Sequence, residues 1–284
     1  MTLLTILVLW VFKGSAVLLS LTEGTMMQGQ DSTSLKWIQL GSSVGMFVLP
    51  PLLLGKIEKK LPEYVRQEGA MSPVLLVLVV AILVSFMPIM HWVIELNSQL
   101  HLPESWAAIE EWMHQKETEM ERLTQLFLKD TQLSSLFLNL LVMAVVPAIG
   151  EELFFRGVIQ KVAVDWFRNP HIAIWVVAIL FSAIHLQFYG FFPRMLLGLL
   201  FGYLYFWSNQ IWLPIFAHFV NNATVVIVAF YLQRQGLSLD DATIGQQIPV
   251  HLYAVCAVVT SFLLYQCWKM THATNQLKNG EKLG

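Results

Sequence analysis

The sequence predicts an all-α membrane protein, a polytopic bundle of about eight transmembrane helices. Composition is the first reason. Of 284 residues, 56% are hydrophobic and 13% are charged, with a mean hydropathy of +0.60, whereas a soluble domain carries about 25% charged residues. The second reason is a series of apolar stretches that approach the roughly 20 residues needed to cross a bilayer. The net charge of −2 gives no indication of a nucleic-acid partner.

The predicted spans follow one another along the whole chain. They are Leu3–Leu21, Trp37–Leu54, Pro73–Leu96, Leu136–Val158, Ile172–Leu186, Met195–Trp207, Ile215–Leu232 and Leu252–Trp268. The fifth and sixth are short, so we expect them to be tilted or surrounded by other helices. A polar tail follows the last span.

One loop between spans has a helical pattern of its own. In Pro103–Asp130, apolar residues recur at helical spacing from Trp106 to Phe127. This pattern predicts an amphipathic helix, which either lies on the membrane surface or connects two spans while packed on the bundle. The sequence leaves both interpretations open.

The loop cations predict the orientation of the chain. One side of the membrane holds Lys56, Lys59, Lys60, Arg66, Lys161, Arg168, Lys269, Lys278 and Lys282, and the other holds Lys36, Lys116, Arg122, Lys129, Arg194 and Arg234. The first side, which also holds both termini, has nine cations and the second has six. Because cytoplasmic loops are enriched in Lys and Arg, the first side and both termini are predicted to be cytoplasmic. We expect the protein to reside in the plasma membrane.

Ionisable and amide side chains interrupt three of the later spans. "VVPAIGEELFFRGVIQ" (145–160) places Glu151, Glu152 and Arg156 in the fourth span. "FSAIH" ends with His185, and "HFVNN" begins with His218 and includes Asn222. Such residues are costly when they face lipid, so we expect them to face the interior and to have a function.

Helical spacing indicates which of these side chains can meet. Glu152 and Arg156 are four residues apart on one face and suit an ion pair, and His218 and Asn222 also share a face. Glu151 is offset from Glu152 by about 100°. We therefore expect Arg156 to hold Glu152, while Glu151 faces His185, His218 and Asn222 on other helices.

These residue types are those of a hydrolytic site. A carboxylate and an imidazole can act as general base on a water molecule. A second imidazole and an amide can donate hydrogen bonds to a developing oxyanion. Each residue alone is also common as interhelical hydrogen-bonding structure, but their concentration in neighbouring spans favours a catalytic site.

The motifs Glu151-Glu152-x-x-x-Arg156, Phe181-x-x-x-His185 and His218-x-x-x-Asn222, in this order, resemble the type II CAAX prenyl endopeptidase and bacteriocin-processing (CPBP, Abi) family of intramembrane proteases. The resemblance covers about Leu136 to Leu232. It divides the chain into N-terminal helices with the amphipathic helix (1–134), a protease-like core (135–233), and a last span with its tail (234–284).

The resemblance implies an intramembrane endopeptidase, a hydrolase of EC class 3.4. Glu151 and His185 would activate the attacking water, and His218 and Asn222 would stabilise the oxyanion. Glu152, Arg156 and Phe181 would support the site. The substrate would be a membrane-associated peptide or protein, with or without a prenyl group, processed as in CAAX maturation or as in bacteriocin or peptide-signal maturation and immunity.

The resemblance leaves the cofactor open, because members of this family are often described as metalloproteases. Zn²⁺ could be held by Glu151, His185 and His218 in a site with three protein ligands. The same residues could instead activate water without a metal, and we prefer that mechanism.

Other functions fit the sequence less well. A zinc protease of the H-E-x-x-H type is excluded because none of the eight histidines is directly followed by a glutamate. "GSSVG" (41–45) lies in an apolar helix rather than a strand-to-helix turn, so it is not read as a nucleophile elbow. "GLLFG" (198–202) predicts a helix-packing face. The remaining alternatives are a non-catalytic immunity protein or scaffold and a proton-coupled transporter.

Overall fold

A computed structural model describes residues 32–65, 72–237 and 249–281, and every regular element within these ranges is helical. This confirms the predicted all-α class. The α-helices are α3 (Ser32–Ser43), α4 (Leu49–Ile57), α5 (Leu61–Tyr64), α6 (Pro73–Ser98), α7 (Ala107–Leu128), α8 (Leu133–Asn139), α9 (Val146–Glu152), α10 (Gln160–Phe167), α11 (Pro170–Ala183), α12 (Phe191–Ser208), α13 (Trp212–Arg234) and α14 (Val250–Glu281). Wider π-helical segments (Val44–Val48, Leu140–Val145 and Leu153–Ile159) join α3 to α4, α8 to α9 and α9 to α10.

Five helical stretches in the described part of the chain are long and apolar enough to cross a membrane, which makes this a multi-pass membrane protein. They are Ser32–Ile57, Pro73–Ser98, Leu133–Phe167, Trp212–Arg234 and Val250–His272. Each contains most of one predicted span. Their outer faces are strongly apolar, since side chains such as Val77, Phe137 and Val258 are about 70% exposed, as expected of lipid-facing residues.

The five candidate spans in the described residues are fewer than the eight predicted. The predicted fifth span is the shorter apolar helix α11, which ends at Ala183 rather than Leu186. The predicted sixth span is α12, a helix outside the five candidates. The predicted first span, Leu3–Leu21, lies outside the described residues.

The chain forms two compact units that do not follow its linear order. The first contains residues 1–64, 118–154 and 218–242, and the second contains 65–117, 155–217 and 243–284. The long helical stretch from α8 to α10 contributes to both units, with the boundary just after Phe154. Each unit is described below by itself.

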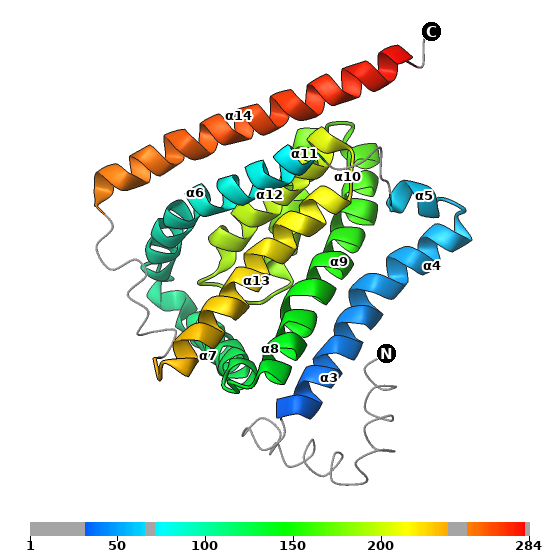
Figure 1. The fold of residues 1–284 in the computed structure, drawn as a ribbon. Coiled ribbons are helices and arrows are strands. Elements are labelled where there is room, and N and C mark those ends of the chain that lie inside the picture. The colour runs from blue at the N-terminus through cyan, green and yellow to red at the C-terminus, as the bar shows by residue number, and fades with distance from the viewer. Residues whose placement is uncertain (1–31, 66–71, 238–248, 282–284) are drawn as a thin grey trace. The chain divides into compact units, whose positions relative to one another are not determined.

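In the first unit, α9 packs closely against the α3–α4 helix (Figure 1). Gly150 makes this approach possible, because a Cβ atom there would lie 3.0 Å from both Phe47 and Val48. Phe154 packs edge-on against Phe47, with ring centroids 5.7 Å apart. The glycine therefore sets the distance between the helices next to the two glutamates.

One charged residue of the first unit corrects the sequence interpretation. Lys36 was counted as a loop cation, yet it lies in the first turns of the candidate span Ser32–Ile57 and is only 2% exposed. Its Nζ donates a hydrogen bond to Ser135 Oγ at 2.9 Å. A buried, hydrogen-bonded lysine does not act as a loop charge. Without Lys36 the cation counts on the two sides are nine and five, and the predicted orientation is the same.

In the second unit, α11 and α12 pack along the predicted glycine face. A Cβ atom on Gly198 would lie 3.2 Å from Ala178, and one on Gly202 would lie 2.9 Å from Ile174. The "GLLFG" motif is therefore a packing face, as predicted. Helices α6, α12 and α14 also pack together, and Figure 1 shows α6 and α14 side by side.

The predicted amphipathic helix is present as α7. Its last residues, Phe127 and Leu128, are buried in the first unit, while Ile109 and Trp112 near its start are 47% and 42% exposed. The last residues of α7 are thus covered by protein, whereas apolar side chains near its start are only partly covered. Contact of those outer residues with a membrane surface stays a prediction.

Candidate active site

Two buried carboxylates end helix α9 in the first unit. Glu151 is 8% exposed and Glu152 is fully buried, and both lie within the candidate span Leu133–Phe167. The π-helical segment 153–159 begins directly after them, and such segments are frequent at functional sites. Burying a carboxylate is costly unless it is hydrogen-bonded, so the neighbours of these two side chains identify what they do.

His218 of α13 meets both glutamates. Its Nδ1 lies 2.9 Å from Glu152 Oε1, and its Nε2 lies 4.0 Å from Glu151 Oε2. The imidazole is 4% exposed. Because an ionised carboxylate only accepts hydrogen bonds, the short contact has the Nδ1–H group donating to Glu152. The distance to Glu151 exceeds that of a hydrogen bond and suits an oxygen atom lying between the two groups.

This geometry corrects one expectation. We expected Glu151 alone to face His218 and Arg156 to hold Glu152 away from it, but Glu152 makes the shorter contact with His218. The reason is that an imidazole has a nitrogen on each edge, so two carboxylates about 100° apart on a helix can both approach it. The pairing of Glu152 with Arg156 stays a prediction.

Asn222 lies one turn beyond His218 on α13, and its Nδ2 donates a hydrogen bond to the carbonyl oxygen of Met143 at 3.1 Å. In a regular α-helix that carbonyl would accept from the N–H of residue 147, which here is Pro147 and has none. The Met143 carbonyl oxygen, between α8 and α9, therefore lacks that backbone donor. The Asn222 amide of α13 donates to it instead.

Asn221 fixes the orientation of this amide. Its Nδ2 donates to Asn222 Oδ1 at 3.0 Å, so the Asn222 carbonyl points toward Asn221 and its amide nitrogen toward Met143. Asn221 is not among the site residues predicted from the sequence. The paired asparagines in "HFVNN" were the available signal, since two adjacent amides in an apolar helix are unusual.

The second unit contains the other predicted residues. Arg156 is fully buried, and its Nη2 donates to the Gly198 carbonyl oxygen at 2.8 Å. Its guanidinium lies over the rings of Phe181 and Phe201, with centroids at 5.0 and 5.6 Å. This is a desolvated cation–π arrangement. Phe181, 3% exposed, thus packs beside the arginine.

His185 follows α11 and is held by Phe181. Its Nδ1 lies 2.8 Å from the Phe181 carbonyl oxygen, and the two rings are 5.3 Å apart in an edge-to-face contact. A carbonyl oxygen only accepts, so Nδ1 carries the hydrogen and Nε2 is the acceptor nitrogen of the neutral ring. His185 is half-buried at the start of the 184–190 loop.

Residues outside the predicted site hold this loop in place. Asn97, 4% exposed at the end of α6, donates from Nδ2 to the backbone carbonyl oxygens of both Phe188 and Tyr189. From α7, the ring of Trp112 lies 5.3 Å from that of Phe188. No spacing pattern connects Asn97 to residues some 90 positions later, so only the fold identifies it.

Tyr189 adds a polar anchor to the same loop. Its hydroxyl lies 2.7 Å from His114 Nε2 of α7, and its backbone N–H donates to Glu117 at 3.4 Å. Burial raises the pKa of Tyr189 above its usual value, and the negative charges of Glu110 and Glu117 raise it further. The phenol therefore stays protonated at neutral pH and can donate its hydrogen to His114.

The zinc hypothesis requires three ligand side chains that lie together. None of the His, Cys, Asp and Glu side chains in the part of the chain with described structure form a group of three suited to one metal ion. Glu151 and His218 are two of the three proposed ligands, but the 2.9 Å contact of His218 is with Glu152, whereas zinc would take each donor at about 2.0–2.2 Å. No step below depends on a metal.

Comparison with known proteins places the same segment in a family context. Residues 133–224 match the model of the family "Rce1-like: Type II CAAX prenyl endopeptidase Rce1-like". The chain is 29% identical over 108 residues to "Putative membrane peptidase YdiL" and 30% identical over 92 residues to "Uncharacterized protein YpbD", both of Bacillus subtilis (strain 168). These alignments cover 36% and 31% of this chain.

The matches are partial in the relatives as well. The chain spans 44% of YdiL and 41% of YpbD, which is less than half of either protein. No solved structure matches the chain. Residues 133–224, which contain the three motifs, are therefore similar to Rce1-like type II CAAX prenyl endopeptidases, as the motifs predicted.

Proposed function

We propose that this protein is an intramembrane endopeptidase that hydrolyses a peptide bond of a membrane-associated or lipidated substrate. The observation that carries the proposal is the buried Glu151–His218–Glu152 cluster within candidate membrane spans. A structural role alone would be satisfied by one acceptor for one imidazole. Here a second carboxylate stands 4.0 Å from the other ring nitrogen, a spacing that suits a reacting oxygen between the two.

In this mechanism Glu151 is the general base. A water molecule attacks the carbonyl carbon of the substrate, and its proton passes to Glu151. The C–N bond of the tetrahedral intermediate then breaks, and Glu151 returns the proton to the leaving amine. The products are a new carboxylate and a new amine, so no other reactant is consumed. His185, assigned on the family resemblance, assists as acceptor through Nε2.

His218 and Asn222 stabilise the oxyanion in this proposal. The contact with Glu152 orients the imidazole so that Nε2 faces the Glu151 side. In this role the ring is an imidazolium that carries a hydrogen on each nitrogen before the water attacks, so Nε2 donates to the oxyanion and no proton is transferred to His218. The Asn222 amide nitrogen has two hydrogens, of which one is donated to Met143. The second is its donor for the oxyanion.

The substrate class and location belong to the same proposal. The site lies in candidate membrane spans, so the scissile bond reaches it from a peptide embedded in or attached to the bilayer. The similarity to type II CAAX prenyl endopeptidases supports a lipidated C-terminal segment as one such substrate. We propose residence in the plasma membrane with cytoplasmic termini, as the loop cations predict.

The test compares new protein termini in membranes that contain the wild type or Glu151→Gln at matched abundance. Glu111→Gln, on the exposed surface of α7, is the control for a lost carboxylate. We expect peptides with new N- or C-termini in wild type and Glu111→Gln, and none with Glu151→Gln. Both ends are read because removal of a short C-terminal peptide leaves no new N-terminus on the main product. Identical termini in all three samples would contradict the proposal.

A further inference from the structure

The backbone is strained directly after His185. Leu186 has a φ of +52°, in the left-handed region that residues other than glycine rarely adopt. Arg168 and Asn209 share this conformation, but they are the C-cap residues of α10 and α12, and helices often end in this way. Leu186 lies two residues beyond Ile184, the C-cap residue of α11. Its conformation therefore belongs to the 184–190 loop.

Burial of the side chain does not account for this conformation. A left-handed backbone places Cβ too close to the following carbonyl oxygen, and glycine, which has no Cβ, avoids this contact. The Leu186 side chain is 46% exposed, so it is not a core residue that the fold requires at this position. Strained backbone of this kind persists only where the surrounding structure holds it, and it is frequent at functional sites. Leu186 therefore depends on the contacts of its neighbours for its conformation.

The end of helix α11 fixes the chain before Leu186. The backbone N–H groups of His185 and Leu186 donate to the carbonyl oxygens three residues earlier, at 3.3 and 3.2 Å. Hydrogen bonds of this type tighten the last turn of a helix. The imidazole is attached to the same turn, because its Nδ1–H group donates to the Phe181 carbonyl oxygen at 2.8 Å. The orientation of the His185 ring is therefore set by the backbone of this turn.

Two buried side chains fix the chain after Leu186. Asn97 of α6 is 4% exposed, and its Nδ2 donates to the carbonyl oxygens of residues 188 and 189. The Ser182 hydroxyl donates to the Phe191 carbonyl oxygen at 2.6 Å, which ties the far end of the loop back to α11. Both ends of the loop are thus held. The left-handed conformation at residue 186 lets the chain connect them.

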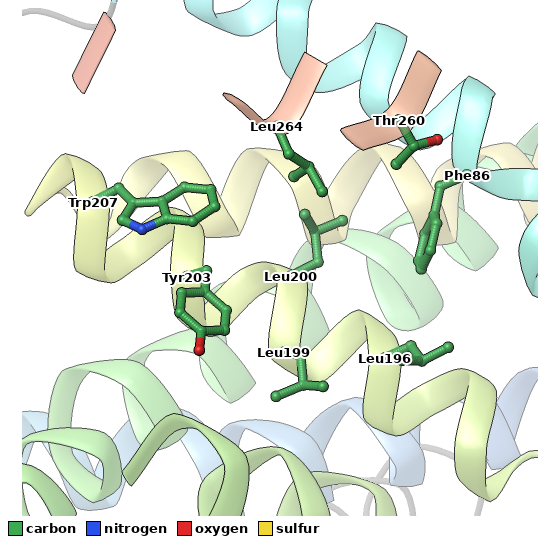
Figure 2. Close-up of a pocket in the computed structure, with 8 residues that line it drawn as sticks. All are labelled: Phe86, Leu196, Leu199, Leu200, Tyr203, Trp207, Thr260 and Leu264. Atoms are coloured by element: carbon green, nitrogen blue, oxygen red, sulfur yellow. The ribbon is translucent and has the colours of Figure 1, made fainter. Parts of the chain in front are cut away.

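The helices that hold the loop pack on one another within the second unit. Helix α11 packs along α12, and α12 packs against α6. Figure 2 shows Phe86 of α6 together with Leu196 and Leu200 of α12 around an apolar recess that these helices line. Apolar packing thus sets where the loop begins, where it ends and where the Asn97 amide lies. The strain at Leu186 follows from these fixed positions.

We propose that Asn97 is a positioning residue for His185. Its two hydrogen bonds hold the loop against the strain at Leu186, and the held loop keeps the His185 imidazole in the single orientation that hydrolysis uses. Without the amide, the backbone at residue 186 relaxes to a negative φ and the turn that carries the imidazole moves. This inference rests on the proposed peptidase function and on the part that His185 has in it.

Turnover by the full-length protein in liposomes tests the proposal with two substitutions in combination. Asn97→Leu should lower kcat on the order of 10–10²-fold with KM nearly unchanged, because misplacement of a reacting group slows the chemical step. Leu186→Gly removes the strain, so alone it should change kcat by less than about twofold. Combined with Asn97→Leu it should restore most of kcat, since a relaxed turn needs less support and the two sites are coupled. Arg168→Gly relieves a left-handed residue at the end of α10 and is the matched control, which should restore nothing.

The orientation of His185 is measured without turnover, by nuclear magnetic resonance of isotope-labelled histidine in nanodiscs. His185→Asn assigns the signal by its loss. We expect a single Nδ1–H tautomer in the wild type and in the double variant, and a mixture of tautomers in Asn97→Leu. Asn97→Ala removes the same hydrogen bonds with a smaller side chain and replaces Asn97→Leu if that variant does not insert.

The two readouts separate this proposal from the peptidase function. A mixture of tautomers in the Asn97 variant supports the hold on His185 even if the wild type hydrolyses nothing, an outcome that would refute the peptidase function alone. A single tautomer in every variant would overturn the positioning role. A double variant with a kcat no higher than that of Asn97→Leu would overturn it as well, because Asn97 would then not be acting against the strain at Leu186.

Discussion

At the scale of single residues, the chemistry centres on one imidazole between two carboxylates. Residue types and spacing predicted that Glu151 faces His218, with Glu152 held by Arg156. They did not predict that Glu152 makes the 2.9 Å contact, because this depends on the rotation of α9 against α13. It also depends on the side-chain rotamers of the two glutamates, which no sequence pattern reports.

Glu152 has a structural part in this cluster that can be measured. Glu152→Ala leaves the buried His218 Nδ1–H without its acceptor, which should cost about 1–3 kcal/mol of stability. Glu152→Gln keeps an acceptor oxygen and should cost less. Thermal unfolding in detergent, compared with the exposed control Glu121→Ala, measures both. An Ala variant as stable as the wild type would show that the contact with His218 does not stabilise the fold.

Asn222 is predicted to act on turnover. Asn222→Ala removes the proposed oxyanion donor and should reduce turnover on the order of 10²–10³-fold. Asn221→Ala only releases the orientation of that amide, so a smaller loss is expected. Turnover is measured with the substrate found by terminus mapping, at equal amounts of inserted protein. Equal, small losses in both variants would assign Asn222 a packing role with Met143 instead.

At the scale of helices, hydrophobic pattern located the elements well. Apolar stretches of spanning length identified α6, α13 and α14, and apolar residues at helical spacing identified the amphipathic helix α7. The π-helical segments 140–145 and 153–159 were missed. A π-turn keeps the same apolar residues and changes only which carbonyl each N–H reaches, so composition does not reveal it. Pro147 is a local signal for the first of these segments. It lacks the N–H that would donate to the Met143 carbonyl oxygen in a regular α-helix.

The anchoring of the 184–190 loop is a helix-level prediction. Asn97→Leu replaces the amide that holds two loop carbonyls with an apolar side chain of similar size. We expect a loss of about 1–3 kcal/mol and faster amide hydrogen exchange in residues 186–190. Gln99→Leu, on the exposed side of the same helix end, should change neither. If loop exchange in Asn97→Leu equals that of the wild type, Asn97 is not the anchor.

At the scale of the whole molecule, composition predicted a multi-pass membrane protein and the five candidate spans agree. The division into two units was not predictable from the sequence. Each unit is assembled from three separated chain segments, and such assembly depends on contacts between residues far apart in the sequence. Composition is similar on both sides of each boundary, so it marks none of them.

Membrane topology can be tested at this scale. We expect both termini in the cytoplasm, because nine loop cations lie on that side. Five Lys and Arg residues remain on the other side when buried Lys36 is left out, and cytoplasmic loops are the ones enriched in these residues. Fusions of a reporter that is active only in the cytoplasm, placed at each end and in the 99–106 loop, give the orientation. We expect activity from both termini and none from the loop. The opposite pattern would invert the orientation, and activity from only one terminus would require an odd number of crossings.

We propose that the carboxylate–imidazole cluster hydrolyses peptide bonds, and this activity can be measured directly. The most direct measurement is the rate of product formation by the purified protein in liposomes, with the peptide identified by terminus mapping as substrate. We expect hydrolysis by the wild type and a loss on the order of 10²–10⁴-fold in Glu151→Gln, with unchanged thermal unfolding. Hydrolysis by Glu151→Gln at the wild-type rate, or none by the wild-type protein in its folded state, would contradict it.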